Sequence, residues 1–214
     1  RIRPEGLQLA QEQYRLHPEV LLPELAAQGI AIDRRKHWRE VQQAWINEYF
    51  QREVLPVLTP VGLDPAHPFP RILNKSLNFI VTLEGKDAFG RKSRAAVVQA
   101  PRILPRIVPL PDEASGDPHG FVLISSVIHA HMEELFPGMK ITGCHQFRVT
   151  RNSDLWVDEE EVEDLLAALK GELPQREFSK AVRLEVADTC PQELALFLQN
   201  QFSLSETDTY EVDG

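Results

Sequence analysis

The chain has 214 residues, 43% of them hydrophobic and 26% charged, which is typical of a folded protein with a sizeable core and excludes a disordered chain. The formal net charge of −9 argues against broad nucleic-acid binding, because phosphate backbones are held by basic surfaces, although it allows a local basic patch. Two cysteines, Cys144 and Cys190, are too few for a disulfide framework, and no apolar run approaches the roughly 20 residues of a membrane-spanning helix, so we expect a cytoplasmic protein without a transmembrane segment.

The N-terminal residues predict an interrupted helix. An apolar stripe at helical spacing runs from Leu7 to Gly29, the expected C-terminal stop. Pro18 and Pro23 must kink or divide this helix, because proline cannot donate the backbone hydrogen bond of a helix interior. Residues 30–32 then form a short extended segment.

Asp33 is the expected N-cap of a second helix, which ends near Arg52. Two tryptophans at helical spacing are typical of core packing rather than of a ligand platform. The side chains expected to share the buried face of this helix are Trp38, Val41, Trp45 and Tyr49.

The least generic stretch is the proline-rich segment 58–78, LTPVGLDPAHPFPRILNKSLN. Each proline fixes its own φ and pushes the preceding residue out of the helical region, which predicts an extended and turned path. Asp64 would favour the charged form of His67, which could contact phosphate, while Asn74 and Asn78 could donate amide hydrogens to a nucleotide. The alternative is structural: a rigid crossover in which Asp64 and His67 staple the loop and the asparagines bind its own carbonyls. The residue pattern leaves both alternatives open.

Alternating apolar residues predict a sheet after this segment. Strands at 77–83 and 94–100 are expected to form a hairpin around the loop 85–92. One face of the first strand carries Leu77, Phe79, Val81 and Leu83. Three prolines confine a further strand, 103–110, to an edge, because proline has no N–H for the ladder.

Residues 111–120 are polar and rich in turn formers, which predicts a mobile surface loop. Residues 121–124 should return to the sheet. A helix is then predicted from Ser125 or Ser126 through Leu135, with its end at Pro137-Gly138.

A long strand is predicted at 140–151, with Phe147 and Val149 on one face and Arg148 on the other. Arg148 and Arg151 lie near the end of this strand, and their planar guanidinium groups suit phosphate or carboxylate, so they are candidate phosphate- or nucleotide-binding residues. The alternative is ordinary ion pairs within the chain. The acids available for such pairs are Asp154, Asp158 and Glu185.

The last third predicts two helices and two strands. Asp158 and Glu161 form a capping box for a helix that ends at Gly171, so this acidic run needs no metal. A strand at 181–186, a helix that begins at Pro191 and carries Leu194, Phe197 and Leu198, and a strand at 209–212 follow. Strands and helices interleave, yet the hairpin and edge prolines oppose a purely parallel sheet. We therefore predict an α+β fold: a mixed β-sheet with packed helices, preceded by a helical appendage.

Known catalytic and metal signatures are missing from the sequence. Neither the GxxxxGK[ST] nor the GxGxxG phosphate loop is present. His129, His131 and Glu133 lie close in sequence, but residues two apart on a helix do not share a face, which disfavours a metal site. No residue is assigned a catalytic role or a metal-ligating role.

Several segments together resemble one family. DPAHPFP at 64–70, LNKSLNF at 73–79, FRVTRNSDL at 147–155 and AVRLEV at 181–186 are similar to the bacterial polyphosphate kinases of the first class, in the family's order. The resemblance implies that residues 1–32 are the last helix of an N-terminal helical domain and that residues 33–214 are the head, or middle, domain. The abrupt ends of the chain also predict a piece cut from a longer protein.

The resemblance implies that the full protein transfers the terminal phosphate of ATP reversibly to inorganic polyphosphate through a phosphohistidine, with Mg²⁺ neutralising the phosphates. The histidine and most ATP contacts belong to two C-terminal catalytic domains that are missing from this sequence, so we expect the piece alone to be inactive and to bind no cofactor tightly. Its expected roles are to shape the nucleotide or polyphosphate path and to contact a second subunit. We expect a cytoplasmic location, which allows peripheral association with a membrane.

Two other functions are considered. One is a free-standing interaction module that binds polyphosphate or a protein and catalyses nothing. The other is an independent phosphohistidine enzyme, which would carry label from ATP on one of its own histidines. We expect no such label on His67, His129, His131 or His145.

Overall fold

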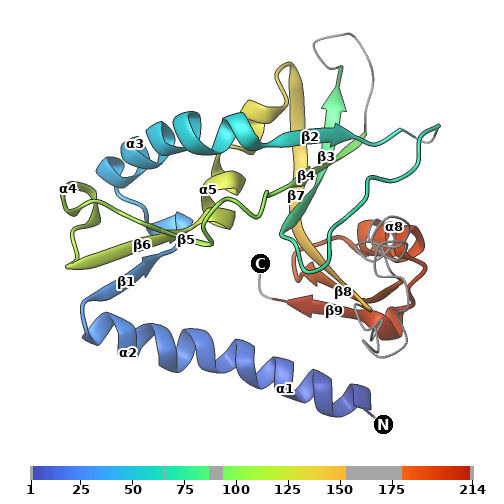
Figure 1. The fold of residues 1–214 in the computed structure, drawn as a ribbon, viewed down its shortest axis with the longest axis horizontal. Helices are drawn as coiled ribbons and strands as arrows, with labels where there is room; N and C mark the ends of the chain where they lie inside the picture. The colour runs from blue at the N-terminus through green and yellow to red at the C-terminus, as the bar shows by residue number, and fades with distance from the viewer. Residues whose placement is uncertain (1, 65, 87–93, 153–179, 213–214) are drawn as a thin grey trace, which may run out of the picture.

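The computed structural model describes residues 2–64, 66–86, 94–152 and 180–212, which form two β-sheets and a long helical arm (Figure 1). A six-stranded sheet has the order β2-β4-β3-β7-β8-β9, and a three-stranded sheet has the order β1-β6-β5. Both sheets mix parallel and antiparallel pairs, and helices pack on them. The α+β prediction is therefore confirmed. The expectation of one sheet is wrong.

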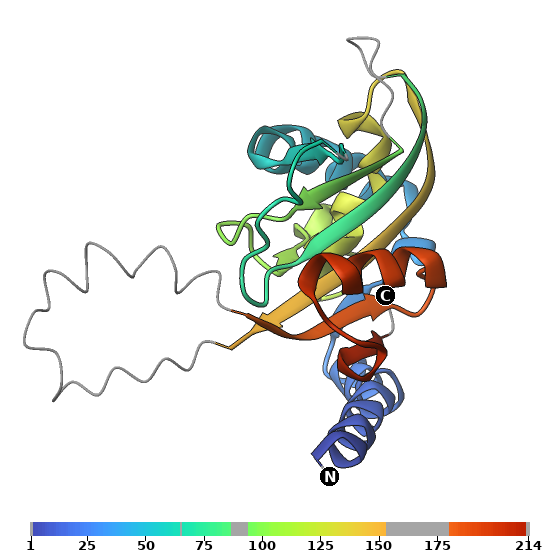
Figure 2. The same cartoon turned by 90° about the vertical axis from the view of Figure 1, so that its right-hand side faces the viewer.

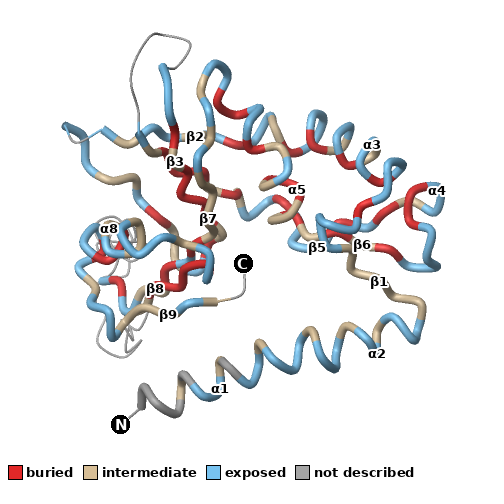
Figure 3. Tube along the Cα trace, turned by 180° about the vertical axis from the view of Figure 1, so that it is seen from behind, coloured by how far each residue is buried: buried red, intermediate tan, exposed pale blue. Residues whose placement is uncertain are grey.

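The arm consists of α1 (Ile2–Leu16) and α2 (Leu22–Ala27), joined by a π-helical turn at His17–Leu21. Pro18 lies in the first turn of the π-helical segment, as expected of a residue that interrupts the helix. Gly29 ends the arm with φ +76°, a conformation that favours glycine, so its predicted role as stop is confirmed. None of the residues from His17 to Ala27 is buried, and the arm runs along one side of the body (Figures 1 and 3).

The predicted extended segment is β1 (Ile30–Asp33), which pairs in parallel with β6 (His119–Leu123). Asp33 therefore belongs to a strand, and its predicted role as a helix N-cap is wrong. Its carboxylate instead accepts a hydrogen bond from Gln42 Nε2 at 2.6 Å, and its carbonyl accepts one from Trp38 Nε1 at 3.1 Å. The domain boundary at residue 32 stays a prediction.

The second helix is α3 (Glu40–Tyr49), continued by a π-helical segment at Phe50–Val54. Its N-cap is Arg39, six residues later than predicted, so the expected buried face is wrong in part: Trp38 is buried but precedes the helix, and Val41 is 56% exposed. Trp45 and Tyr49 stack on each other at 5.2 Å and are only partly buried. The side chains that face the core are spaced by four, and they are Gln42, Ile46, Phe50 and Val54.

The six-stranded sheet contains every strand predicted with clear alternation. The strands of this sheet are β2 (Thr59–Gly62), β3 (Asn78–Gly85), β4 (Ala95–Gln99), β7 (Met139–Arg151), β8 (Ala181–Ala187) and β9 (Thr209–Val212). The predicted hairpin is confirmed, since β3 and β4 pair antiparallel.

This sheet carries a hydrophobic core on each face, unlike the single apolar face expected for β3. Phe79 and Val81 pack with α3 and with α5 (Ile124–Ala130) in one core. Ile80 on the opposite face packs with Phe147 and with α8 (Gln192–Phe202) in the other core (Figure 2). Helices on both faces explain why β3 is almost continuously buried from Asn78 to Leu83 (Figure 3).

The three-stranded sheet was not expected. Residues 121–124 were predicted to return to the main sheet, but β6 pairs with β1 and with the edge strand β5 (Ile107–Pro109). The predicted loop at 111–120 contains a short helix, α4 (Asp112–Ser115), whose Ala114 and Ser115 are buried. The Arg39 guanidinium donates hydrogen bonds to the carbonyls of both residues and ties α4 to the start of α3.

Two expectations cannot be compared with the structure. The predicted helix capped by Asp158 lies outside the described residues, and so does most of the loop at 85–92. The helix predicted from residue 125 or 126 is α5 followed by a 3-10 turn at Met132–Leu135.

His129 on α5 makes stability depend on pH. Burial lowers its pKa to about 4, and the nearby charges of Arg35 and His145 act in the same direction. An unfolded histidine titrates near pH 6.5, so the stabilisation is complete above that pH and is lost as the pH falls from about 6.5 toward 4. Because His129 is partly exposed, we expect the loss to be no more than about 2 kcal/mol. Denaturant unfolding at pH 7.5 and 4.5 should show it, and His129→Gln should show a smaller loss. An equal loss in both proteins would contradict the assignment.

Candidate phosphate-binding site

A cavity of about 440 Å³ lies where the proline-rich segment meets the ends of β7, β8 and α8. Three of the residues that line it are basic: Arg71 from the segment, Arg151 at the end of β7 and Lys180 before β8. The other lining residues are Phe69, Pro70, Ala181, Gln201, Phe202 and Ser203. We call this cavity the basic pocket.

The Arg151 side chain is held in place by the segment it faces. Its Nε donates a hydrogen bond to the carbonyl of Ile72 at 2.9 Å, and its guanidinium carbon lies 5.8 Å from the ring centroid of Phe202. Partial burial lowers the pKa of Arg151, but a guanidinium keeps its proton at neutral pH. The result is a positioned cation at the rim of a cavity.

Asn74 fastens the same segment to β7. Its side-chain carbonyl accepts a hydrogen bond from the backbone N–H of Arg151 at 2.9 Å, and its backbone carbonyl accepts one from Arg102 Nη2 at 2.8 Å. Lys75 follows with φ +55°, a conformation uncommon for a residue with a Cβ, and its N–H donates to the Val149 carbonyl at 2.8 Å. Arg102 and Arg151 therefore flank Asn74 in a chain whose overall charge is negative.

Such an arrangement fits phosphate oxygens. Guanidinium groups offer paired donors to phosphate, and lysine adds a mobile point charge. The segment rests on a rigid strand end, so Arg151 keeps its place without a ligand. Of the predicted site residues, Arg151 contributes its side chain to this pocket, and the Asn74 side chain holds the backbone of Arg151.

Arg148 does not line the basic pocket. It pairs with Glu185 on the neighbouring strand, and this hydrogen bond raises its pKa. Glu185 is 4% exposed and also accepts from Arg183 Nη2 at 2.6 Å. The structure thus has the ion pair that the alternative expected for Arg148.

His67 and Asp64 lie at an exposed turn and do not line the basic pocket. Their side chains are 3.3 Å apart, and the Ala66 N–H donates to the Asp64 carboxylate at 2.9 Å. That backbone hydrogen bond is the main reason why the pKa of Asp64 is lowered, with His67 adding to it. The arrangement matches the alternative in which the two residues staple the loop.

Asn78 is fully buried, and its amide donates to the backbone carbonyl of Ser76 at 2.8 Å. It therefore binds a carbonyl of its own segment, as the structural alternative held. Sequence reasoning missed Arg71 and Lys180. No sequence pattern distinguishes either residue from other basic residues, and only the fold brings both close to Arg151.

Within the described part of the chain, no group of three or more His, Cys, Asp or Glu side chains is arranged to hold a metal ion. His131, considered for such a site, stacks on Phe50 at 4.4 Å, and its Nδ1 lies 2.9 Å from the Val127 carbonyl. None of the helices described is both long and apolar enough to cross a membrane.

Comparison with known proteins places the chain in a family. Residues 41–214 match the family model described as the polyphosphate kinase middle domain. The polyphosphate kinase of Neisseria meningitidis serogroup C is 60% identical over 206 residues, which are 96% of this chain and 30% of that protein. The polyphosphate kinase of Pseudomonas aeruginosa is 56% identical over 202 residues, which are 94% of this chain and 29% of that protein.

The fold comparison agrees. The crystal structure of polyphosphate kinase from Porphyromonas gingivalis matches 99% of this chain and 30% of its own chain, with a TM-score of 0.77 at 20% identity, which shows a shared fold. The chain spans about 30% of the length of the curated relative that is 60% identical to it. It belongs to the polyphosphate kinase family and corresponds to the middle domain of those proteins.

Proposed function

We propose that the chain is the middle region of an enzyme that transfers the terminal phosphate of ATP reversibly to inorganic polyphosphate. The full enzyme would use Mg²⁺ and a phosphohistidine carried by domains outside these 214 residues, so the chain alone would be inactive. We also propose that the enzyme is a cytoplasmic dimer, with or without peripheral association with a membrane. The proposed activity is supported by the chain's identity of about 60% to a protein named polyphosphate kinase.

The specific contribution that we assign to this region is a grip on a phosphate chain. The observation that carries it is the basic pocket, where Arg71, Arg151 and Lys180 line one cavity of about 440 Å³. A linear polyanion gains from several cations spaced along a surface, and each contact releases counterions. By placing these cations, the region would form one wall of the path taken by polyphosphate or by the phosphates of a nucleotide.

A second candidate is a module that binds polyphosphate without taking part in catalysis. The basic pocket supports both candidates equally, because it shows no catalytic group. They differ in what happens when the pocket is damaged in the full enzyme: turnover of polyphosphate would change in the first case only.

The test uses the full-length protein that contains these residues. Incubation with γ-labelled ATP and Mg²⁺ should give polyphosphate and a labelled histidine, located by mass spectrometry outside residues 1–214. The control is the same protein treated with mild acid, which should release the label because phosphohistidine is acid-labile. Label on His67, His129, His131 or His145, or a lack of polyphosphate synthesis, would contradict the proposal.

A further inference from the structure

Strand β9 is an outer strand of the six-stranded sheet in the described structure, and it pairs with β8 on one side. The Val212 carbonyl accepts a hydrogen bond from the Asp188 N–H at 2.8 Å, so Val212 points its backbone groups inward. Backbone groups alternate along a strand, so Tyr210 also faces β8. The N–H and C=O groups of Thr209 and Glu211 therefore point to the open edge.

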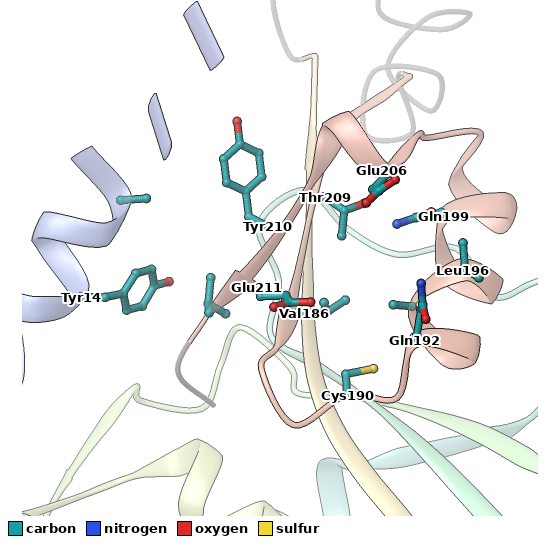
Figure 4. Close-up of a pocket in the computed structure, with 13 residues that line it drawn as sticks. Tyr14, Val186, Cys190, Gln192, Leu196, Gln199, Glu206, Thr209, Tyr210 and Glu211 are labelled. Carbon is teal, nitrogen blue, oxygen red and sulfur yellow. The ribbon is translucent and has the colours of Figure 1, made fainter. Parts of the chain in front are cut away.

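A cavity of about 600 Å³ extends around this edge on both faces of the sheet. Figure 4 shows Tyr14 of α1 on one side of β9, and Gln192, Leu196 and Gln199 of α8 on the other. An extended chain added beside β9 would point successive side chains alternately into these two halves. The cavity thus has the shape that strand addition requires: a hydrogen-bonding edge with a side-chain site on each face.

The two halves differ in chemistry. Glu206 and Glu211 line the cavity, and no lysine or arginine is among its described lining residues. Glu211 shares its face with Thr209 and lies near Cys190, whose thiol pKa is raised by burial and by the Glu211 charge. The α1 half is aromatic, lined by Tyr14 and Tyr210, and the Arg183 guanidinium carbon lies 3.9 Å from the Tyr210 ring centroid.

The other edge of the sheet is protected, and β9 is not. Strand β2 carries Pro60, which has no N–H to donate, and proline is a common defence of edge strands. The β9 sequence TYEV contains no proline or lysine. The β9 edge therefore presents N–H and C=O groups beside a cavity, to which a partner strand can add.

We infer that β9 pairs with an extended segment from the part of the full-length polypeptide outside these 214 residues, and that this segment directs lysine or arginine toward α8 and apolar side chains toward α1. The source is argued from length, because the matched region makes up only 30% of a relative. The basis for the basic side chains is charge complementarity with Glu211. Strand β9 does not line the basic pocket, so an experiment can disprove the strand pairing without disproving the phosphate site, and the reverse.

The test is photo-crosslinking in the full-length protein. Thr209 is replaced by p-benzoylphenylalanine, and ¹⁵N-labelled and unlabelled copies are mixed before irradiation. We expect crosslinks to residues outside 1–214 within the same copy, at a segment with alternating basic residues. A matched control places the same group at Val61 on the protected edge strand β2 and should give no crosslink to that segment.

Charge variants and amide exchange test the inference further. Glu211→Lys should lower the crosslink yield at least about fivefold, because like charges across an interface are unfavourable, and Glu211→Gln should lower it less. In the unmodified protein, the Glu211 amide should exchange with deuterium slowly. Rapid exchange, crosslinks between labelled and unlabelled copies, crosslinks confined to residues 1–214, or a yield no higher than at Val61 would each overturn the inference.

Discussion

The variant Arg71→Gln/Lys180→Gln of the full-length protein should raise the KM for polyphosphate about 30-fold and leave the KM for ATP and the kcat nearly unchanged. Each substitution removes one cation from the basic pocket while its backbone and its neighbour Arg151 stay in place. At about 1 kcal/mol for each exposed charge-assisted contact, two contacts give about 2 kcal/mol, which is about 30-fold in affinity. Contacts made equally in the ground and transition states alter KM rather than kcat.

The matched control is Arg106→Gln/Lys140→Gln. Both residues are exposed bases that do not line the basic pocket, so the net charge changes equally. We expect less than a twofold change in KM from this control, together with an unchanged salt dependence. In the pocket variant the salt dependence of the KM should become shallower, since fewer counterions are released. Equal effects of the two double variants would contradict a local phosphate site.

The variant Glu185→Ala should lower the free energy of unfolding by about 2–3 kcal/mol. Glu185 is 4% exposed and holds Arg148 and Arg183 together across β7 and β8. Removal of the shared carboxylate leaves two like charges side by side, and breaking a buried ion pair costs about 3–5 kcal/mol. We expect a smaller loss than this because the Arg148 side chain is 48% exposed and can regain water. Arg183 Nε, which is buried without a hydrogen-bond partner in the described structure, limits that recovery.

Urea unfolding of the 214-residue chain measures this effect. Glu84→Ala, an exposed acid near the end of β3, is the matched control and should change stability by less than about 0.5 kcal/mol. A loss below about 1 kcal/mol for Glu185→Ala would show that the triad of charges contributes little.

The strands were predictable because their signal is local. Residues 140–151 and 181–186 alternate at period two in the sequence, and both stretches form strands in the folded chain. The three-stranded sheet was not predictable in this way, because β1 and β6 are brought together from distant parts of the sequence. Nothing local distinguishes a short strand that joins a second sheet from one that returns to the first.

The buried face of α3 shows a second limit. Trp38 is buried as predicted, although it precedes α3, and Trp45 is only partly buried. The face of α3 that reaches the core carries Ile46 instead, with Gln42 buried through its hydrogen bond to Asp33. A polar residue in a core position depends on a partner that periodicity does not reveal. Asp33 was wrongly predicted as a helix N-cap for the same reason, because its partner Gln42 cannot be identified from periodicity.

The candidate site was predictable only in part. The position of the Arg151 guanidinium at a strand end could be predicted from the sequence. The same reasoning was applied to Arg148, but that residue forms an ion pair instead. The difference lies in a neighbour across the sheet, Glu185, whose pairing register with Arg148 no local pattern gives. The pocket itself combines residues from four separate stretches, so its volume and its other two cations appear only in the fold.

The pairing of β1 with β6 also bears on synthesis of the protein. Ile30 pairs with His119, about 90 residues later in the chain, and Arg39 binds the carbonyls of Ala114 and Ser115. A ribosome that adds about 5–20 residues per second therefore exposes the arm for about 4–18 s before its anchoring strand has been made. During that interval β1 lacks the strand with which it pairs, so the three-stranded sheet cannot form. Chaperones that bind nascent chains would meet β1 in this window.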